Sequence, residues 1–144
     1  MFSKAISLRK KIDLAHQRMG GTGRANFIFL GDINTMGMNL TYSAKDVTAK
    51  EEIERLSNRI SRKSIQMNIL SKTHESTWWP GSNSAYPIGN LDHVVSADHL
   101  KFKDFHGTSV DVRGWVDEDS DIKKDAWTKK YSDHSLLYFE VQKV

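Results

Sequence analysis

The feature that most constrains the fold is a short apolar run that ends in polar residues. Phe27–Leu30 is continuously apolar and rich in aromatic and branched side chains, and Gly31–Asn34 (Gly-Asp-Ile-Asn) follows it. Such a run is typical of a strand that is buried on both faces. If the chain stays extended, the side chains of Asp32 and Asn34 point the same way and form a plausible place for chemistry. The alternative is a strand-terminating turn, since Gly, Asp and Asn are common turn residues.

Length and composition set the outer bounds. A chain of 144 residues has room for one domain with a real core and is too short for two ordinary domains. The net charge of +3 permits a phosphate-rich partner but hardly argues for one. The absence of cysteine excludes disulfides and disfavours a structural zinc site. It leaves the compartment open, with the cytoplasm slightly favoured. No apolar run reaches transmembrane length, and we expect no signal peptide.

Two amphipathic helices are expected in the first half of the chain. The apolar stripe of the first consists of Ala5, Leu8, Ile12, Ala15 and Met19, and the helix ends at Gly20–Gly21. An irregular stretch is expected over Thr35–Val47. A second helix then begins at Thr48, because Thr48 and Glu51 fit a capping box. Its apolar stripe is Ile53, Leu56 and Ile60, and its basic residues, Arg55, Arg59, Arg62 and Lys63, form a solvated face or a nucleic-acid contact.

The second half of the chain contains most of the expected strands. Ser64–Leu70 is a weak candidate, Leu91–Ser96 is a buried strand, Ser109–Val116 alternates, and Ser135–Val141 is a last buried strand. Asp117–Lys130 is acidic first and basic last, which suits a short helix.

Both prolines lie in a loop-rich stretch, Thr73–Asn90, so no regular element runs through it. Its adjacent tryptophans, Trp78 and Trp79, point to opposite faces if the chain is extended there. At least one of them therefore belongs to the core, and the other is free to stack on a base or to line a substrate groove.

Three short motifs recur at the expected strands. Gly-Asp-Ile-Asn (Gly31–Asn34) follows the first strand, Leu-Asp-His-Val (Leu91–Val94) lies within a second, and Ser-Asp-His (Ser132–His134) precedes the last. In this order and at these separations they resemble the C-terminal half of the endonuclease/exonuclease/phosphatase superfamily, whose fold is that of the DNase I-like nucleases. The resemblance implies an α+β class: half of a DNase I-like α/β sandwich, with one mainly antiparallel sheet and helices on one face.

The resemblance also implies a role for each motif residue. Asp32 would orient or deprotonate the attacking water, and Asn34 would bind the scissile phosphate or the nucleophile. Asp133 would be a ligand of Mg²⁺ or Mn²⁺. His134 would donate to the phosphate oxygens, and Asp92 would fix the orientation and tautomer of His134. A buried, satisfied Asp92–His134 pair without chemistry remains the alternative for those two residues.

The family's catalytic domain is about twice as long, and its N-terminal half supplies further metal and phosphate ligands. We therefore expect a metal-dependent phosphodiesterase or phosphatase site that is weak or inactive in this chain alone. The partners implied are a phosphate-ester substrate such as DNA or RNA, and either the missing N-terminal half or a second copy of the chain. Two alternatives stay open: a non-catalytic module that binds nucleic acid or protein, and an ordinary α/β domain in which the motif residues are scattered in space.

Overall fold

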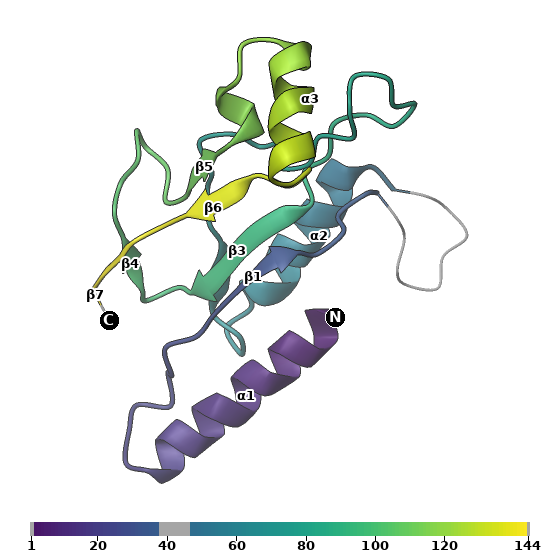
Figure 1. The fold of residues 1–144 in the computed structure, drawn as a ribbon. Coiled ribbons are helices and arrows are strands. Elements are labelled where there is room, and N and C mark those ends of the chain that lie inside the picture. Colours follow the sequence, from purple (N-terminus) through teal and green to yellow (C-terminus); the bar gives the residue numbers. More distant parts are fainter. Residues whose placement is uncertain (1, 38–46, 144) are drawn as a thin grey trace.

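The computed structural model describes residues 2–37 and 47–143. Its elements, in chain order, are α1 (Phe2–Arg18), β1 (Ile28–Asp32), α2 (Ala49–Ile60), β2 (Met67–Ile69), β3 (Asp92–Ala97), β4 (Lys101–Phe102), β5 (Asp111–Arg113), the 3₁₀ helix η1 (Trp115–Asp117), α3 (Asp121–Lys130), β6 (Leu136–Tyr138) and β7 (Val141–Lys143) (Figure 1). The expected α+β class is confirmed. Most of the irregular stretch expected over Thr35–Val47 lies outside the described residues.

The described strands form three small antiparallel sheets, where the sequence predicted one mainly antiparallel sheet. They are the three-stranded sheet β1-β3-β2 and the pairs β4-β7 and β5-β6. Figure 1 shows β6 running beside β3, and the two strands are in contact. All of β3 is buried, as predicted for the strand Leu91–Ser96. β3 is therefore the centre of the fold, with β1 and β2 paired to its two edges.

Helices α1 and α2 cover one face of the β1-β3-β2 sheet. Ile6 of α1 and Ile60 of α2 pack with Ile65, Met67 and Val95 in one apolar cluster. The capping box predicted at Thr48 is present, with its side chain accepting from the Glu51 backbone N–H. Local sequence therefore sets where α2 begins, and Ile60 fixes the helix to the sheet.

The buried side of α1 differs from the predicted stripe. Ile6 and Arg9 are buried, whereas Leu8 is 51% and Met19 85% exposed. Arg9 reaches this position because its guanidinium donates to the carbonyl of Ala25 and lies 3.2 Å from the Asp13 carboxylate. Because the carbonyl accepts from its guanidinium and the carboxylate balances its charge, Arg9 is buried on the inner side of the helix, where the sequence predicted Leu8.

The first and last strands are less buried than expected. Leu30 of β1 is 54% and Leu136 of β6 58% exposed, and the predicted last strand divides into β6 and β7. Phe29 and Val95 face the helices, so alternation places Leu30 and Val94 on the opposite face. This second face of the sheet is open at Leu30, which explains why a continuously apolar run is only partly buried.

Trp79 is the core tryptophan of the predicted pair. It is 6% exposed and its ring lies 5.6 Å from that of Trp115 in η1. Helix α3 contacts η1 and lies at the end of the molecule away from α1 (Figure 1). Among the described helices, none is both long and apolar enough to cross a membrane.

Candidate active site

The first two motifs meet at one end of the central sheet. Asp32 is the last residue of β1, Asp92 is the first of β3, and the two lie opposite each other in the antiparallel register. Their side chains share a sheet face, because directly paired residues of an antiparallel ladder point the same way. This is the face opposite the helices, which is exposed at Leu30 of β1 and covered at Val94 of β3.

The third motif brings His134 to the same place. A single bridge pairs His134 with Trp78 just before β6 begins, and the His134 Nδ1 atom lies 2.7 Å from Asp92 Oδ2. Asp92 is 7% exposed and His134 is partly buried. In the neutral imidazole, Nδ1 carries the proton that it donates to the carboxylate, so Nε2 is left for a ligand.

Three carboxylates raise the pKa of His134. Partial burial is the largest single influence and lowers its pKa, but the hydrogen bond and the charge of Asp92 act in the opposite direction. The charges of Asp133 and Asp32 add to this, and the net result is a raised pKa. His134 is therefore a better-populated cation than an ordinary histidine near neutral pH.

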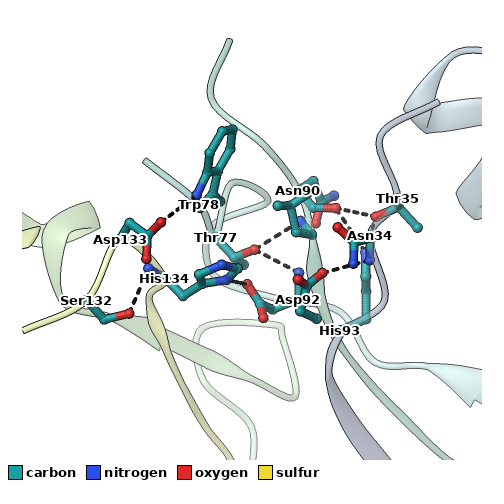
Figure 2. A network of polar contacts seen from close by, with 12 residues as sticks. Asn34, Thr35, Thr77, Trp78, Asn90, Asp92, His93, Ser132, Asp133 and His134 are labelled. Atoms are coloured by element: carbon teal, nitrogen blue, oxygen red, sulfur yellow. Dashed lines mark hydrogen bonds and ion pairs between the residues drawn. The ribbon is translucent and has the colours of Figure 1, made fainter. Parts of the chain in front are cut away.

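Asp133 and Trp78 hold each other. Trp78 Nε1 donates to Asp133 Oδ2 at 2.9 Å, and the Trp79 backbone N–H donates to the Asp133 carbonyl, also at 2.9 Å. Asp133 is exposed, and in the described part of the chain its second carboxylate oxygen has no donor. Figure 2 shows Trp78, Asp133 and His134 on one side of Asp92, with Asn34 and Thr35 on the other.

Asn34 lies beyond the end of β1 in a conformation that the sequence did not predict. Its φ of 52° is in the left-handed region, so Asp32 and Asn34 are not two positions of one extended strand. The Asn34 backbone N–H donates to Asp32 Oδ1 at 2.7 Å, which forms a tight turn. Asn34 is exposed at the same end of the sheet, but the turn and not strand alternation places it there.

Sequence reasoning missed the two side chains that hold the backbone of Asp92. Thr77 is fully buried, and its Oγ1 accepts from the backbone N–H groups of Leu91 at 3.1 Å and Asp92 at 2.9 Å. Lys72 Nζ donates to the carbonyl of Asp92 at 2.8 Å and to the side-chain oxygen of Asn90 at 2.5 Å. A threonine and a lysine in a loop-rich stretch carry no local signal of such a role.

A second missed group ties the Asn34 turn to β3. His93 is 2% exposed, and its Nε2 lies 2.9 Å from Thr35 Oγ1 and 3.1 Å from the Asn90 carbonyl. Thr35 Oγ1 itself donates to that carbonyl, so Nε2 is the protonated nitrogen. Burial and the charge of Lys72 lower the pKa of His93 to about 4, and it is neutral at physiological pH.

A pocket of about 120 Å³ borders this network. Thr35, Trp78 and Asn90 belong to both, and Tyr86 and Ile88 add an exposed aromatic ring and an exposed apolar side chain to its wall. The pocket thus offers a mostly apolar surface next to charged and hydrogen-bonding groups. Such a combination suits a ligand that has a flat or apolar part beside a polar one.

The described residues offer the expected metal ion at most two carboxylates, those of Asp133 and Asp32. Among the residues that the structure describes, no group of three or more His, Cys, Asp or Glu side chains is arranged to hold a metal ion. Mg²⁺ is commonly bound through only one or two carboxylates, with water and substrate oxygens completing its shell. Asp133 is exposed and has one carboxylate oxygen without a donor in the described part of the chain, so it fits such a ligand. Asp32 lies near it, since the charges of both residues raise the pKa of His134.

The site residues thus lie together, which contradicts the alternative in which the motifs are scattered in space. No protein-family model matches the chain, and no curated protein or solved structure is significantly similar to it. The likeness to the DNase I-like superfamily therefore depends on the motif residues and their arrangement alone.

Proposed function

We propose that the chain carries part of the active site of a metal-dependent phosphoric ester hydrolase, with a phosphodiester of DNA or RNA as the substrate. The observation that supports this most strongly is the meeting of three motifs, distant in sequence, around the Asp92–His134 hydrogen bond of 2.7 Å. A general base, an oriented imidazole and an exposed carboxylate are the groups that hydrolysis of a phosphate ester requires.

Asp92 and His134 form the electrophilic arm of the proposed site. Asp92 accepts from Nδ1 and so directs Nε2 away from the sheet, toward the substrate. The raised pKa of His134 favours the form in which Nε2 also carries a proton. This proton is donated to a phosphate oxygen as negative charge builds up in the transition state.

Asp32 and Asn34 form the nucleophilic arm. One oxygen of Asp32 accepts from the Asn34 backbone N–H, and the other orients and deprotonates the attacking water. The same turn leaves the Asn34 side chain exposed, where its amide donates to the phosphate or to the nucleophile. In this role Asp32 must be ionised and His134 protonated, so the two residues act as a base and a proton donor on one substrate.

Asp133 is the residue that would hold Mg²⁺ or Mn²⁺. When bound, such an ion neutralises charge on the phosphate oxygens. The Trp78 Nε1 donor fixes the Asp133 carboxylate so that it does not rotate freely. The ring of Trp78 and the adjoining pocket support a nucleic-acid substrate, because a base can stack or insert beside the phosphate there.

Two exposed leucines support the proposal that a further layer completes the site. Leu30 and Leu136 are large apolar side chains, each more than half exposed, on strands that carry Asp32 and follow His134. Either a polypeptide that resembles the N-terminal half of the DNase I-like fold or a second copy of the chain would cover them. Without such a layer we expect little or no turnover from this chain.

A second function is favoured by a different observation. The basic residues on α2 and just after it, Arg55, Arg59, Arg62 and Lys63, are all exposed, which is the charge pattern of a surface that attracts phosphate backbones. A binding module of this kind would hold nucleic acid without cleaving it. It requires neither Asp32 nor His134.

The test combines catalysis with metal binding. Hydrolysis of bis-p-nitrophenyl phosphate and of plasmid DNA is measured with Mg²⁺ and with EDTA, for the wild-type protein and for Asp32→Ala, Asp133→Ala and His134→Ala. Metal-dependent cleavage that each variant loses supports the proposal. In parallel, Mn²⁺ is titrated into ¹⁵N-labelled protein, where it should broaden the resonances of residues 132–134 in wild type and not in Asp133→Ala. Nucleic-acid binding that survives all three variants, with no cleavage and no local broadening, would assign the chain to the binding module.

A further inference from the structure

Asp92 begins β3 at a place where its neighbouring strand has ended. β2 pairs with β3 from Met67↔Ala97 to Ile69↔Val95, and the Leu70 backbone N–H still donates to the Val94 carbonyl at 2.8 Å. Continued in the same register, the ladder would place Lys72 opposite Asp92. The backbone instead turns away there, and the peptide groups of Asp92 face an edge without a strand.

Side chains replace the missing ladder bonds. Thr77 Oγ1 accepts from the Asp92 backbone N–H at 2.9 Å, and Lys72 Nζ donates to the Asp92 carbonyl at 2.8 Å. Both peptide groups of Asp92 on this edge are therefore satisfied. Buried peptide groups are costly to leave unpaired, so the first residue of β3 keeps an extended, fixed backbone.

The position of Lys72 is itself fixed at its backbone. Lys72 forms a parallel bridge with Val110, which is fully buried. On the two sides of this bridge, the Val110 N–H donates to the Ser71 carbonyl at 3.0 Å, and the Thr73 N–H donates to the Val110 carbonyl, also at 3.0 Å. An ammonium group that extends from so constrained a backbone can act as a rigid support.

The ammonium group is also enclosed by polar and charged groups. Asp92 and Glu75 favour its charge, the buried and neutral His93 lies close enough to be affected by it, and Asn90 Oδ1 accepts from it at 2.5 Å. Burial outweighs these influences and lowers the pKa of Lys72 to about 8. A lysine held at such a cost in desolvation usually has a specific partner or task.

Asn90 connects this support to the other arm of the site. Its carbonyl accepts from Thr35, next to Asn34, and lies 3.1 Å from His93 Nε2, while its side chain accepts from Lys72. The bonds from Lys72 thus lead in one direction to Asp92, the partner of His134, and in the other through Asn90 to Thr35 in the Asn34 turn. Figure 2 shows the contact between Asn90 and Thr35.

We propose that Lys72 is a positioning residue: it replaces the strand that ends beside Asp92 and, by holding the Asp92 carbonyl and the Asn90 side chain, directs the Asp92 carboxylate at His134. The role depends on the proposed function for its consequence in catalysis, but its geometric part stands independently. Lys72 does not contact the substrate, and its effect reaches the reacting atoms through Asp92.

The first experiment replaces Lys72 by methionine, which fills a similar volume without a donor. Lys103→Met is the matched control, because Lys103 is a partly exposed lysine in a salt bridge with Glu140. We expect the downfield Nδ1–H resonance of His134 to shift upfield or to disappear by exchange in Lys72→Met and to be unchanged in Lys103→Met. We also expect kcat to fall about tenfold or more while KM changes little, since misaligned groups bind substrate but catalyse poorly.

A second variant tests the ammonium group of residue 72 separately from any effect of the substitution on folding. The chain has no cysteine, so Lys72→Cys can be alkylated at a single sulfur in the unfolded protein and then refolded. Bromoethylamine restores an ammonium group at the position of Nζ, and 1-bromopropane gives a neutral side chain of the same length. The aminoethyl product should regain the His134 resonance and the rate, and the propyl product should not.

The outcomes are distinct. A wild-type Nδ1–H resonance in folded Lys72→Met, or equal behaviour of the two alkylated products, would overturn the role of Lys72. If the wild-type protein neither hydrolyses a phosphodiester nor shows Mn²⁺ broadening at residues 132–134, the proposed function fails, but the His134 resonance still decides whether Lys72 positions Asp92.

Discussion

Asp92 and His134 are 42 residues apart in sequence, and a hydrogen bond of 2.7 Å joins them at the end of the central strand. The bond leads from a nearly buried carboxylate to a partly exposed imidazole, so the protein surface presents Nε2 while Nδ1 is used inside. Asp32 lies opposite Asp92 in the strand register, so a second carboxylate lies beside the pair.

The charge state of His134 should depend on Asp92. We expect Asp92→Asn to lower the pKa of His134, because the amide removes the hydrogen-bond acceptor and the charge that raise it, while burial, which lowers it, remains. NMR titration of the His134 ring in metal-free protein measures the shift. The control is Asp98→Asn, which changes an exposed carboxylate that pairs with Arg24 and should leave the titration of His134 unchanged. An identical titration in Asp92→Asn would show that the pair does not set the charge.

The apolar cluster beneath the sheet should dominate stability. Ile60→Ala removes a fully buried side chain between α2 and the sheet and should lower the free energy of unfolding by about 3 kcal/mol. Ile122→Ala makes the same change on α3 at a residue that is 83% exposed, and it should alter stability by less than about 0.5 kcal/mol. Urea unfolding of both variants measures the difference, and equal losses would contradict the assignment of the core to this cluster.

The parts of the fold that were predictable from sequence depend on local patterns. The Thr48 capping box needs only residues three apart, and Leu91–Ser96 could be assigned to a buried strand without knowledge of its neighbours. The motif residues Asp32, Asp92 and His134 could be located because each flanks or begins a strand. Their closeness in space was an expectation from the family resemblance, and the geometry agrees with it.

The parts that sequence did not reveal depend on distant partners. Arg9 is buried because the Ala25 carbonyl and Asp13 meet its guanidinium, and no helical periodicity predicts such a position. Leu30 is exposed because the described residues that cover its face of the sheet bury Val94 on β3 but do not extend over Leu30 on β1. Thr77 and Lys72 act on Asp92 only because β2 ends early, which is a property of the register and not of any motif.

The hydroxyl of Thr77 should be required for the local stability of β3. Thr77→Val keeps the shape but removes the acceptor for two buried backbone N–H groups, so we expect a loss of roughly 1–3 kcal/mol. In Thr77→Val, hydrogen exchange should accelerate relative to wild type at the amides of Leu91 and Asp92, and less so at the amide of Val95 in the middle of the strand. Thr22→Val, at an exposed position, serves as the control. Unchanged exchange at Asp92 would mean that the edge of β3 is held without Thr77.

The burial of His93 should make the protein sensitive to acid. Its pKa is about 4 in the folded protein, against 6.5 for an ordinary histidine. As the pH falls from 6.5 toward 4, the unfolded chain therefore binds a proton that the folded protein does not, and stability is lost. The shift corresponds to about 3 kcal/mol at the acid end of this window. His93→Gln, which keeps a donor for Thr35, should flatten this part of the stability profile, whereas His74→Gln at an exposed position should not.

His134 has the opposite effect on stability, because its raised pKa stabilises the fold below pH 6.5 and this contribution fades as the pH rises. Urea unfolding from pH 4 to 8 measures both effects, and parallel profiles for wild type and His93→Gln would show that His93 is not the buried neutral base of the fold.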